Sequence, residues 1–260
     1  MKPIGLYMIN DPDAPYLTLA DRVRLFADTG FDYVCFSAEQ ALETDALDLA
    51  EKNGLPVDNV HLSGSGTNDL WLKGLAGDAV AERYCREIAA VAARGIRLGV
   101  AHVTWGKKAV PCNVLGLQRI GRIIDYAEQN DFVIGFENSV SPDIHLRTVL
   151  DTFRSPAAGF TFDTGHWHCF APDSTFPSEY AGRLVITHIQ DNDGTDDQHR
   201  LPFDGTVDFA GLVPILRQAA RLTFEPGRRA KNPGLYGAMS YEEHIACIYQ
   251  AAIRVAELVG

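Results

Sequence analysis

The sequence FVIGFEN at residues 132–138 is followed, after one intervening segment, by GFTFDTGH at residues 159–166. Each stretch starts as a short apolar run, and the run ends in a carboxylate, Glu137 in the first and Asp163 in the second. Runs rich in Val, Ile and Phe with few polar interruptions are typical of strands that are buried on both faces. Because the two runs start 27 residues apart, they predict a strand, a helix and a second, parallel strand.

The same alternation of strand and helix extends through the whole chain. Apolar runs of strand length occur at residues 4–8, 33–36, 59–62, 98–103, 132–136, 159–162, 184–189 and 222–224. Eight strand-helix units in 260 residues predict an α/β fold, a (β/α)8 TIM barrel that forms one domain over residues 1–260. An open doubly wound sheet is the alternative, but the GxGxxG turn usual after its first strand is missing.

Capping signals mark several of the predicted helices. Residues 18–21 predict the start of the first helix, and Gly30 predicts its end. Residues 141–142, Ser-Pro, predict an N-cap followed by proline in the first turn. Residues 240–243 have capping-box spacing ahead of the last helix, which carries apolar residues at helical intervals.

Composition and charge exclude several classes of protein. The chain has 23 Lys and Arg against 34 Asp and Glu, a formal net charge of −11, so we expect no nucleic-acid partner. No apolar run has the length of a membrane span, and the first residues lack the features of a signal peptide, so we expect a cytoplasmic protein. Reduced thiols are expected because no CxxC occurs among the cysteines, which are Cys35, Cys85, Cys112, Cys169 and Cys247.

Side chains that can bind metal ions follow six consecutive predicted strands, and in a barrel these strand ends meet at one mouth. They are His61, His102, Glu137, Asp163, His166, His188, Asp197, His199 and Glu225. Carboxylates gathered at one mouth repel one another unless a cation lies between them, so the pattern predicts a divalent metal, Mn²⁺, Mg²⁺, Co²⁺ or Zn²⁺, and no organic cofactor. Of the other histidines, we expect His145 and His244 on helix surfaces and His168 as a loop neighbour.

At these residues the sequence resembles the xylose-isomerase-like TIM barrel superfamily, which includes AP endonuclease family 2 and the sugar phosphate isomerases and epimerases. The most specific parts of the resemblance are Glu137-Asn138, DTGH at 163–166, His188-x-x-Asp191-Asn192, Asp197-x-His199 and Glu225. In the epimerase branch the resemblance implies one metal ion, bound by Glu137, Asp163, His188 and Glu225. It also implies that Glu137 and Glu225 are the catalytic residues that move the proton and that His166 binds a substrate oxygen.

The zinc AP endonucleases hold three zinc ions with nine ligands, and each has a match here. The resemblance therefore leaves His61, His102, His166, Asp197 and His199 as additional metal ligands or as substrate-binding residues. Further substrate contacts are expected from Trp105 and Trp167, which could cover a sugar ring, and from Arg200, which could hold a phosphate or carboxylate. Other cations after barrel strands are Lys107, Lys108, Arg228 and Arg229.

We therefore expect a metal-dependent isomerase or epimerase of a sugar, a sugar phosphate or a related hydroxy-ketone. Proton transfer would proceed through a metal-stabilised enediolate. The expected partner is a small sugar or polyol, with no membrane partner, and many barrels of this superfamily are homo-oligomers. One alternative is a multi-zinc phosphodiesterase similar to the AP endonucleases, which the acidic composition disfavours. The other alternative is a non-catalytic, ligand-binding barrel.

Overall fold

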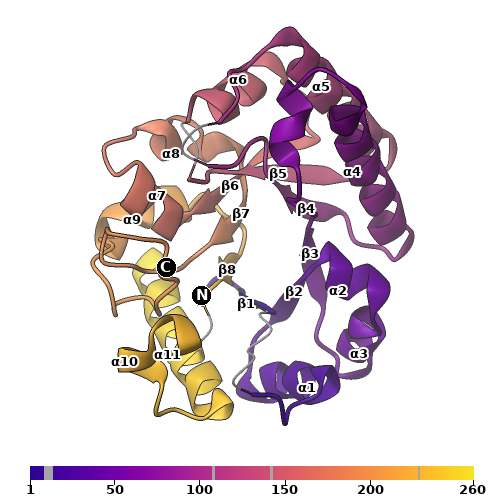
Figure 1. Ribbon diagram of the computed structural model, residues 1–260. Coiled ribbons are helices and arrows are strands. Elements are labelled where there is room, and N and C mark those ends of the chain that lie inside the picture. Colours follow the sequence, from indigo (N-terminus) through magenta and orange to yellow (C-terminus); the bar gives the residue numbers. More distant parts are fainter. Residues whose placement is uncertain (9–13, 107–108, 141–142, 228) are drawn as a thin grey trace.

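The computed structural model describes residues 1–8, 14–106, 109–140, 143–227 and 229–260. Within these residues, eight parallel strands form a barrel surrounded by helices, which confirms the predicted (β/α)8 fold (Figure 1). The predicted strands differ from the observed ones by at most two residues at either end. The strands are β1 (Ile4–Tyr7), β2 (Tyr33–Ser37), β3 (Val57–His61), β4 (Leu98–Ala101), β5 (Val133–Glu137), β6 (Ala158–Asp163), β7 (Leu184–His188) and β8 (Leu222–Phe224).

The barrel closes between β7 and β8 through a residue that lies just beyond β7. Ile189 forms a parallel bridge with Phe224, and its N–H donates to the carbonyl of Thr223 at 2.9 Å. The Ile189 carbonyl in turn accepts from the N–H of Glu225 at 3.0 Å. The Thr187 hydroxyl oxygen accepts from the N–H of Thr223 at 2.9 Å, so a side chain takes the place of one backbone bond. Closure therefore fixes the backbone at Glu225, a predicted site residue.

Side chains fill the barrel below its mouth. Tyr33 of β2 extends across Gly5 of β1, and its hydroxyl lies 3.0 Å from that of Thr223 in β8. A Cβ atom at residue 5 would lie 2.1 Å from the Tyr33 ring, so this crossing requires glycine. The interior at this level is therefore a packed core, as is usual in such barrels, and the polar groups lie nearer the carboxyl ends of the strands.

The outer layer consists of helices that follow the strands. They are α1 (Leu19–Thr29), α2 (Ala38–Glu43), α3 (Ala46–Lys52), α4 (Leu75–Ala93), α5 (Val114–Gln129), α6 (Ile144–Thr152), α7 (Thr164–Phe170), α8 (Phe176–Glu179), α9 (Phe209–Leu216), α10 (Pro233–Tyr236) and α11 (Tyr241–Val259). Thr18 and Ser240 form the predicted capping boxes, and Gly30 ends α1 with a φ of 107°. The N-cap of α6 is Asp143, and the cap predicted at residues 141–142 lies outside the described residues.

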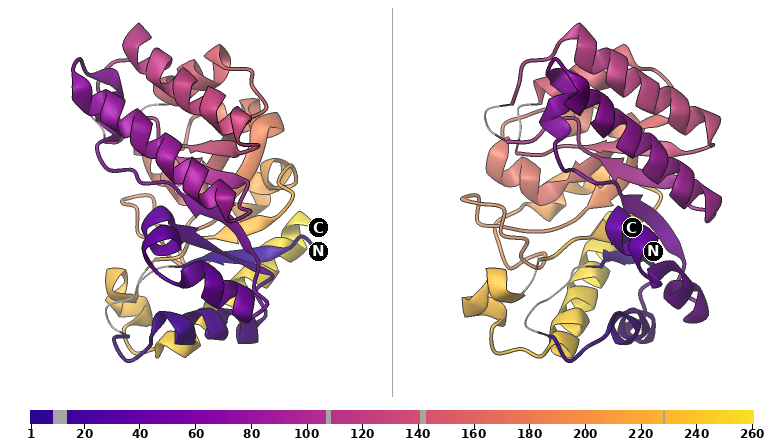
Figure 2. Two further views of the ribbon diagram at one scale, coloured as in Figure 1. Left: turned by 90° about the vertical axis from the view of Figure 1, so that its right-hand side faces the viewer. Right: turned by 45° about the vertical axis from the view of Figure 1, so that its right-hand side comes forward.

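The two ends of the described chain lie side by side, as Figures 1 and 2 show. Lys2 Nζ donates to the carbonyl of Arg217 at 3.1 Å, and Arg217 Nε donates to the carbonyl of Val259 at 2.9 Å. Arg217, the residue after α9, therefore forms hydrogen bonds with residues near both ends of the described chain. In the part of the chain that the structure describes, no helix is both long and apolar enough to cross a bilayer.

Two of the three remaining histidines lie in places that differ from the prediction. His145 in α6 and His244 in α11 are buried, so the prediction of surface positions was wrong. The Nε2 atom of His145 lies 2.6 Å from the carbonyl of Val110, so this end of the buried ring keeps a hydrogen-bond partner. His168, predicted as a loop neighbour, lies in the last turn of α7, and its Nδ1 atom is 2.7 Å from Asn192 Oδ1.

Candidate metal centre

All nine predicted metal-competent residues lie at or just beyond the carboxyl ends of strands. Six of them are the last residue of a strand or the first one after it. These are His61 (β3), His102 (β4), Glu137 (β5), Asp163 (β6), His188 (β7) and Glu225 (β8). His166 lies in the first turn of α7, while Asp197 and His199 belong to the long connection between β7 and α9.

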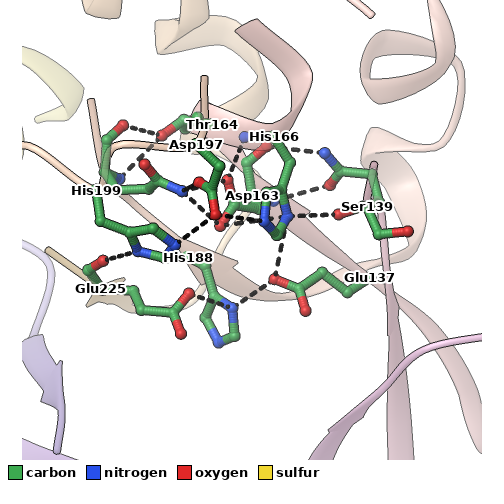
Figure 3. A network of polar contacts seen from close by, with 12 residues as sticks. Glu137, Ser139, Asp163, Thr164, His166, His188, Asp197, His199 and Glu225 are labelled. Atoms are coloured by element: carbon green, nitrogen blue, oxygen red, sulfur yellow. Dashed lines mark hydrogen bonds and ion pairs between the residues drawn. The ribbon is translucent and has the colours of Figure 1, made fainter. Parts of the chain in front are cut away.

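Four of these residues form one group of potential ligands. Each offers an atom within 4.8 Å of the others, and they are Glu137, Asp163, His188 and Glu225. His188 Nδ1 lies between two carboxylates, 2.6 Å from Glu137 Oε1 and 3.1 Å from Glu225 Oε2 (Figure 3). One imidazole nitrogen with three carboxylates is a donor set suited to a divalent transition-metal ion.

Charges in this group depend strongly on one another. Burial alone would raise the pKa of Glu137, but attraction to His188 and a hydrogen bond from it hold this pKa well below its ordinary value. Burial would lower the pKa of His188, yet Glu225 and Glu137 raise it well above the usual range. Burial raises the pKa of Asp163 to about 6. The charge of His166 opposes this rise, whereas the charges of Glu137 and Glu225 add to it. A proton on His188 and a divalent cation would therefore compete for the same carboxylates.

A second group lies on one side of the first and shares Glu137 with it. His61 Nε2 and His102 Nε2 lie 3.4 Å and 3.3 Å from Glu137 Oε2. Burial lowers the pKa of His102 to about 3, so its ring is neutral at physiological pH. Among the described residues, Glu137 Oε2 and His102 Nδ1 are buried and have no hydrogen-bond partner. A neutral imidazole such as that of His102 is a competent metal ligand.

A third group lies on the other side and gathers around Asp197. His199 Nε2 is 2.9 Å from Asp197 Oδ2, and His166 Nε2 is 3.7 Å from the same oxygen. Burial would raise the pKa of Asp197, but hydrogen bonds from His166 and His199 lower it below its ordinary value. Burial would lower the pKa of His166, but Asp163 and Asp197 raise it to about 10.

Backbone carbonyls orient the rings of three histidines in these groups. His61 Nδ1 lies 2.9 Å from the carbonyl of Leu62, and His166 Nδ1 lies 2.9 Å from that of Asn138. His199 Nδ1 lies 2.7 Å from the carbonyl of Glu225. In each ring Nδ1 can donate to a carbonyl while Nε2 faces a carboxylate, which is how metal-binding histidines are usually held. The donor chemistry, the buried unpartnered atoms and these ring orientations all fit a divalent metal.

Metal binding is expected to release protons and to strengthen as the pH rises from about 6 to 8. The reason is that the pKa of His188 is raised well above its ordinary value, and a ligand nitrogen must lose its proton before it binds metal. Calorimetric titration of Zn²⁺ in buffers of different ionisation enthalpy measures the number of protons released. His188→Asn is expected to release fewer, and an affinity independent of pH would contradict the proposed competition.

The two predicted tryptophans have different surroundings. Trp105 is 47% exposed, and its ring centroid lies 5.0 Å from that of His102 and 6.2 Å from that of His166. Both backbone polar groups of Trp105 are held by Asn68, at 2.8 Å and 2.7 Å. Trp167 is half-buried against the core, and its indole N–H donates to the carbonyl of Ser174 at 3.2 Å. Trp105 is therefore the better placed of the two to contact a substrate.

The predicted cations are held by protein groups where the structure describes them. Arg200 Nη2 donates to Asp193 Oδ2 at 2.7 Å, so a substrate anion would have to compete with this carboxylate. Arg229 is buried and donates to the carbonyl of Met239. The other predicted cations, Lys107, Lys108 and Arg228, lie outside the described residues.

Two further residues near these groups were missed by the sequence analysis. Tyr7 ends β1, with its ring centroid 6.1 Å from that of His61 and 6.2 Å from that of His188. Burial, followed by the charge of Glu225, raises the pKa of its phenol above the ordinary value. Gln190 donates to two of the site's carboxylates. The position of Tyr7 at a strand end was a usable signal, but a phenol and an amide are uncommon metal ligands.

Residues 23–247 match the family described as xylose isomerase-like TIM barrel, and the chain belongs to this family. A curated relative, the uncharacterized protein y4fM of Sinorhizobium fredii, is 31% identical over 113 residues. This match covers 43% of the chain, which spans only 35% of the length of that relative.

Two solved structures share the fold over nearly their whole length. One is D-psicose 3-epimerase from Clostridium cellulolyticum H10, determined with D-tagatose, at a TM-score of 0.76 and 12% identity. The alignment covers 100% of this chain and 99% of that one. The other is D-allulose 3-epimerase from Methylomonas sp. in complex with D-allulose, at a TM-score of 0.74 and 18% identity, covering 100% and 97% of the two chains. At these identities the likeness establishes the fold alone.

Proposed function

We propose that the protein is a divalent-metal-dependent epimerase or isomerase whose substrate is a sugar or a related hydroxy-ketone. The observation that carries the proposal is the pair of glutamates on either side of His188, of which Glu137 is buried and Glu225 is partly buried. Glu137 at the end of β5 and Glu225 after β8 both reach its Nδ1 atom (Figure 3). The two sugar epimerases that share the fold add support, because their structures were determined with the ketoses D-tagatose and D-allulose.

Epimerisation next to a carbonyl needs a base for the carbon-bound proton and stabilisation of the charge that develops on oxygen. A divalent ion held by the four-ligand group would supply this stabilisation by polarising the substrate's carbonyl and hydroxyl oxygens. Attraction to His188 outweighs burial and lowers the pKa of both Glu137 and Glu225, so each is ionised and able to accept a proton at neutral pH. If one glutamate removes the proton and the other returns one to the opposite face, the carbon is inverted.

The remaining predicted residues would bind and orient the substrate. His166 lies beside the four-ligand group, with Nδ1 3.7 Å from Asp163 Oδ2, and is proposed to bind a substrate oxygen. Trp105 is proposed to cover the apolar face of the sugar, because nearly half of its surface is exposed next to His102 and His166.

A multi-zinc phosphodiesterase is the second candidate function. It is favoured by the two flanking groups, each of which brings three ligand atoms within 4.8 Å of one another. The formal net charge of −11 opposes this candidate when the substrate is a polyanion such as DNA, because phosphate binding relies on Lys and Arg. The number of bound metal ions separates the two candidates.

The test of the proposed function measures metal content first and proton exchange second. Elemental analysis of the purified protein is expected to give about one divalent ion per chain. Incubation with a panel of ketoses and aldoses in D₂O is then expected to place deuterium on the carbon next to the carbonyl. Chelation should abolish this exchange, and Mn²⁺, Co²⁺, Mg²⁺ or Zn²⁺ should restore it.

Other outcomes of these measurements would assign the protein a different function. Two or three zinc ions per chain, with hydrolysis of a phosphodiester and no exchange, would favour the phosphodiesterase. Metal and sugar binding without exchange in any reloaded sample would contradict catalysis and indicate a ligand-binding barrel.

A further inference from the structure

Gln190 lies between the four-ligand group and the group around Asp197. Its side chain is fully buried, and Nε2 donates to Asp197 Oδ1 at 2.7 Å. The same nitrogen lies 3.3 Å and 3.4 Å from the two carboxylate oxygens of Asp163. One amide group therefore donates toward two neighbouring carboxylates.

The orientation of the Gln190 amide follows from its partners. Both neighbours are carboxylates that accept hydrogen bonds, so the NH₂ end and not the oxygen must face them. Oε1 has no hydrogen-bond partner in the part of the chain that the structure describes, so the amide acts through its nitrogen alone. With Asp197 Oδ1 occupied, Asp197 Oδ2 is the oxygen that faces His166 and His199.

Residues at the start of α7 fix Gln190 in this position. The Thr164 hydroxyl donates to the Gln190 carbonyl at 2.7 Å and accepts from the Gln190 N–H at 3.1 Å (Figure 3). The next residue is Gly165, where a Cβ atom would lie 2.3 Å from both Cδ and Oε1 of Gln190. Glycine at this position therefore leaves the space that the amide occupies.

We propose that Gln190 is a positioning residue that orients Asp163 for metal binding and holds the neighbouring Asp197 in place, while adding no positive charge beside the metal. A neutral donor is suited to this task. A lysine here would compensate one of the charges that attract the metal, and a glutamate would repel both carboxylates. The inference rests on the proposed function only in that the site binds a divalent metal, and it does not depend on which substrate is used.

The test compares Zn²⁺ affinity among purified variants, measured by competition with a chromophoric chelator. Gln190→Leu removes the donor, and Gly165→Ala displaces it without altering Gln190 itself. Each is expected to weaken Zn²⁺ binding by about 10- to 100-fold, the usual effect of losing a group that orients a metal ligand. Gly182→Ala is the matched control, because a Cβ atom at that position meets nothing within 4 Å.

A purely structural role is separated from positioning by two readouts. Positioning predicts that Gly165→Ala alters the visible absorption of the Co²⁺-loaded protein, and that Gln190→Asn, which keeps an amide, recovers part of the affinity lost in Gln190→Leu. A purely structural role would lower the melting temperature of the chelated protein without changing these readouts. If Gln190→Leu does not fold, Gly165→Ala and Gln190→Asn decide the question.

The inference would be overturned if Gln190→Leu and Gly165→Ala both bind Zn²⁺ with an affinity within threefold of that of the unaltered protein. It would also be overturned if the unaltered protein binds no Zn²⁺. If both variants bind Zn²⁺ more weakly but the unaltered protein exchanges no sugar proton, this inference is supported and only the proposed function is contradicted.

Discussion

Glu137→Gln and Glu225→Gln are each expected to slow sugar proton exchange by about 10²- to 10⁴-fold, the usual contribution of a positioned acid or base, while the fold remains intact. Glutamine matches the shape of glutamate but cannot accept the carbon-bound proton. The measurement is the rate of deuterium incorporation from D₂O at saturating metal, together with the metal content of each variant, because both residues are also potential ligands.

The matched control for these variants is Glu51→Gln, an exposed residue of α3 outside the three groups of potential ligands. This control is expected to exchange at the rate of the unaltered protein. Near-normal exchange in either Glu137→Gln or Glu225→Gln would rule out a mechanism that uses both glutamates. A variant that keeps its metal and loses exchange would assign the loss to proton transfer.

Asp191→Ala is expected to destabilise the protein by about 3 kcal/mol or more, since it leaves several buried donors without a partner. Its carboxylate accepts from four backbone N–H groups, those of Asn192, Phe203, Gly205 and Val207, at 2.8 to 3.0 Å. These bonds fold the connection between β7 and α9, which carries Asp197 and His199. Loss of this connection should also weaken metal binding.

Urea unfolding of the chelated protein measures this effect. The matched control is Asp208→Ala, which removes an N-cap at α9 that accepts from the N–H of Gly211 at 3.1 Å. A cap of this kind is worth about 1 kcal/mol. Equal unfolding midpoints and slopes for the two variants would contradict the proposed role of Asp191.

The fold and the set of candidate ligands could be predicted from the sequence because both depend on local patterns. The runs around Glu137 and Asp163 have the length and the β-branched and aromatic content of buried parallel strands, and their regular spacing implies a barrel. Barrel geometry then brings the strand ends together, so residues far apart in sequence could be assigned to one mouth. The prediction that these residues are ligands and catalytic groups still awaits the experiments above.

The role of residues between the strands could not be predicted, because it depends on contacts that no local pattern encodes. The sequence pattern predicts a surface position for His145, yet the carbonyl of Val110 gives its ring a partner inside the protein. Trp167 follows His166 in sequence, but its indole N–H binds Ser174 and its ring packs on the core. Gln190 owes its place to the missing side chain of Gly165, a relation visible only in three dimensions.

The closure of the barrel between β7 and β8 has a consequence for how the protein folds during synthesis. Glu137, Asp163 and His188 can come together once residues 133–188 have left the ribosome, but Glu225 takes its place only when β8 pairs with β1 and bridges to Ile189. Pairing of segments this distant in sequence is slow because it closes a long loop. If these four residues bind a metal ion as proposed, the fourth ligand is in place only once the barrel is closed, and tight metal binding would then mark a completed fold.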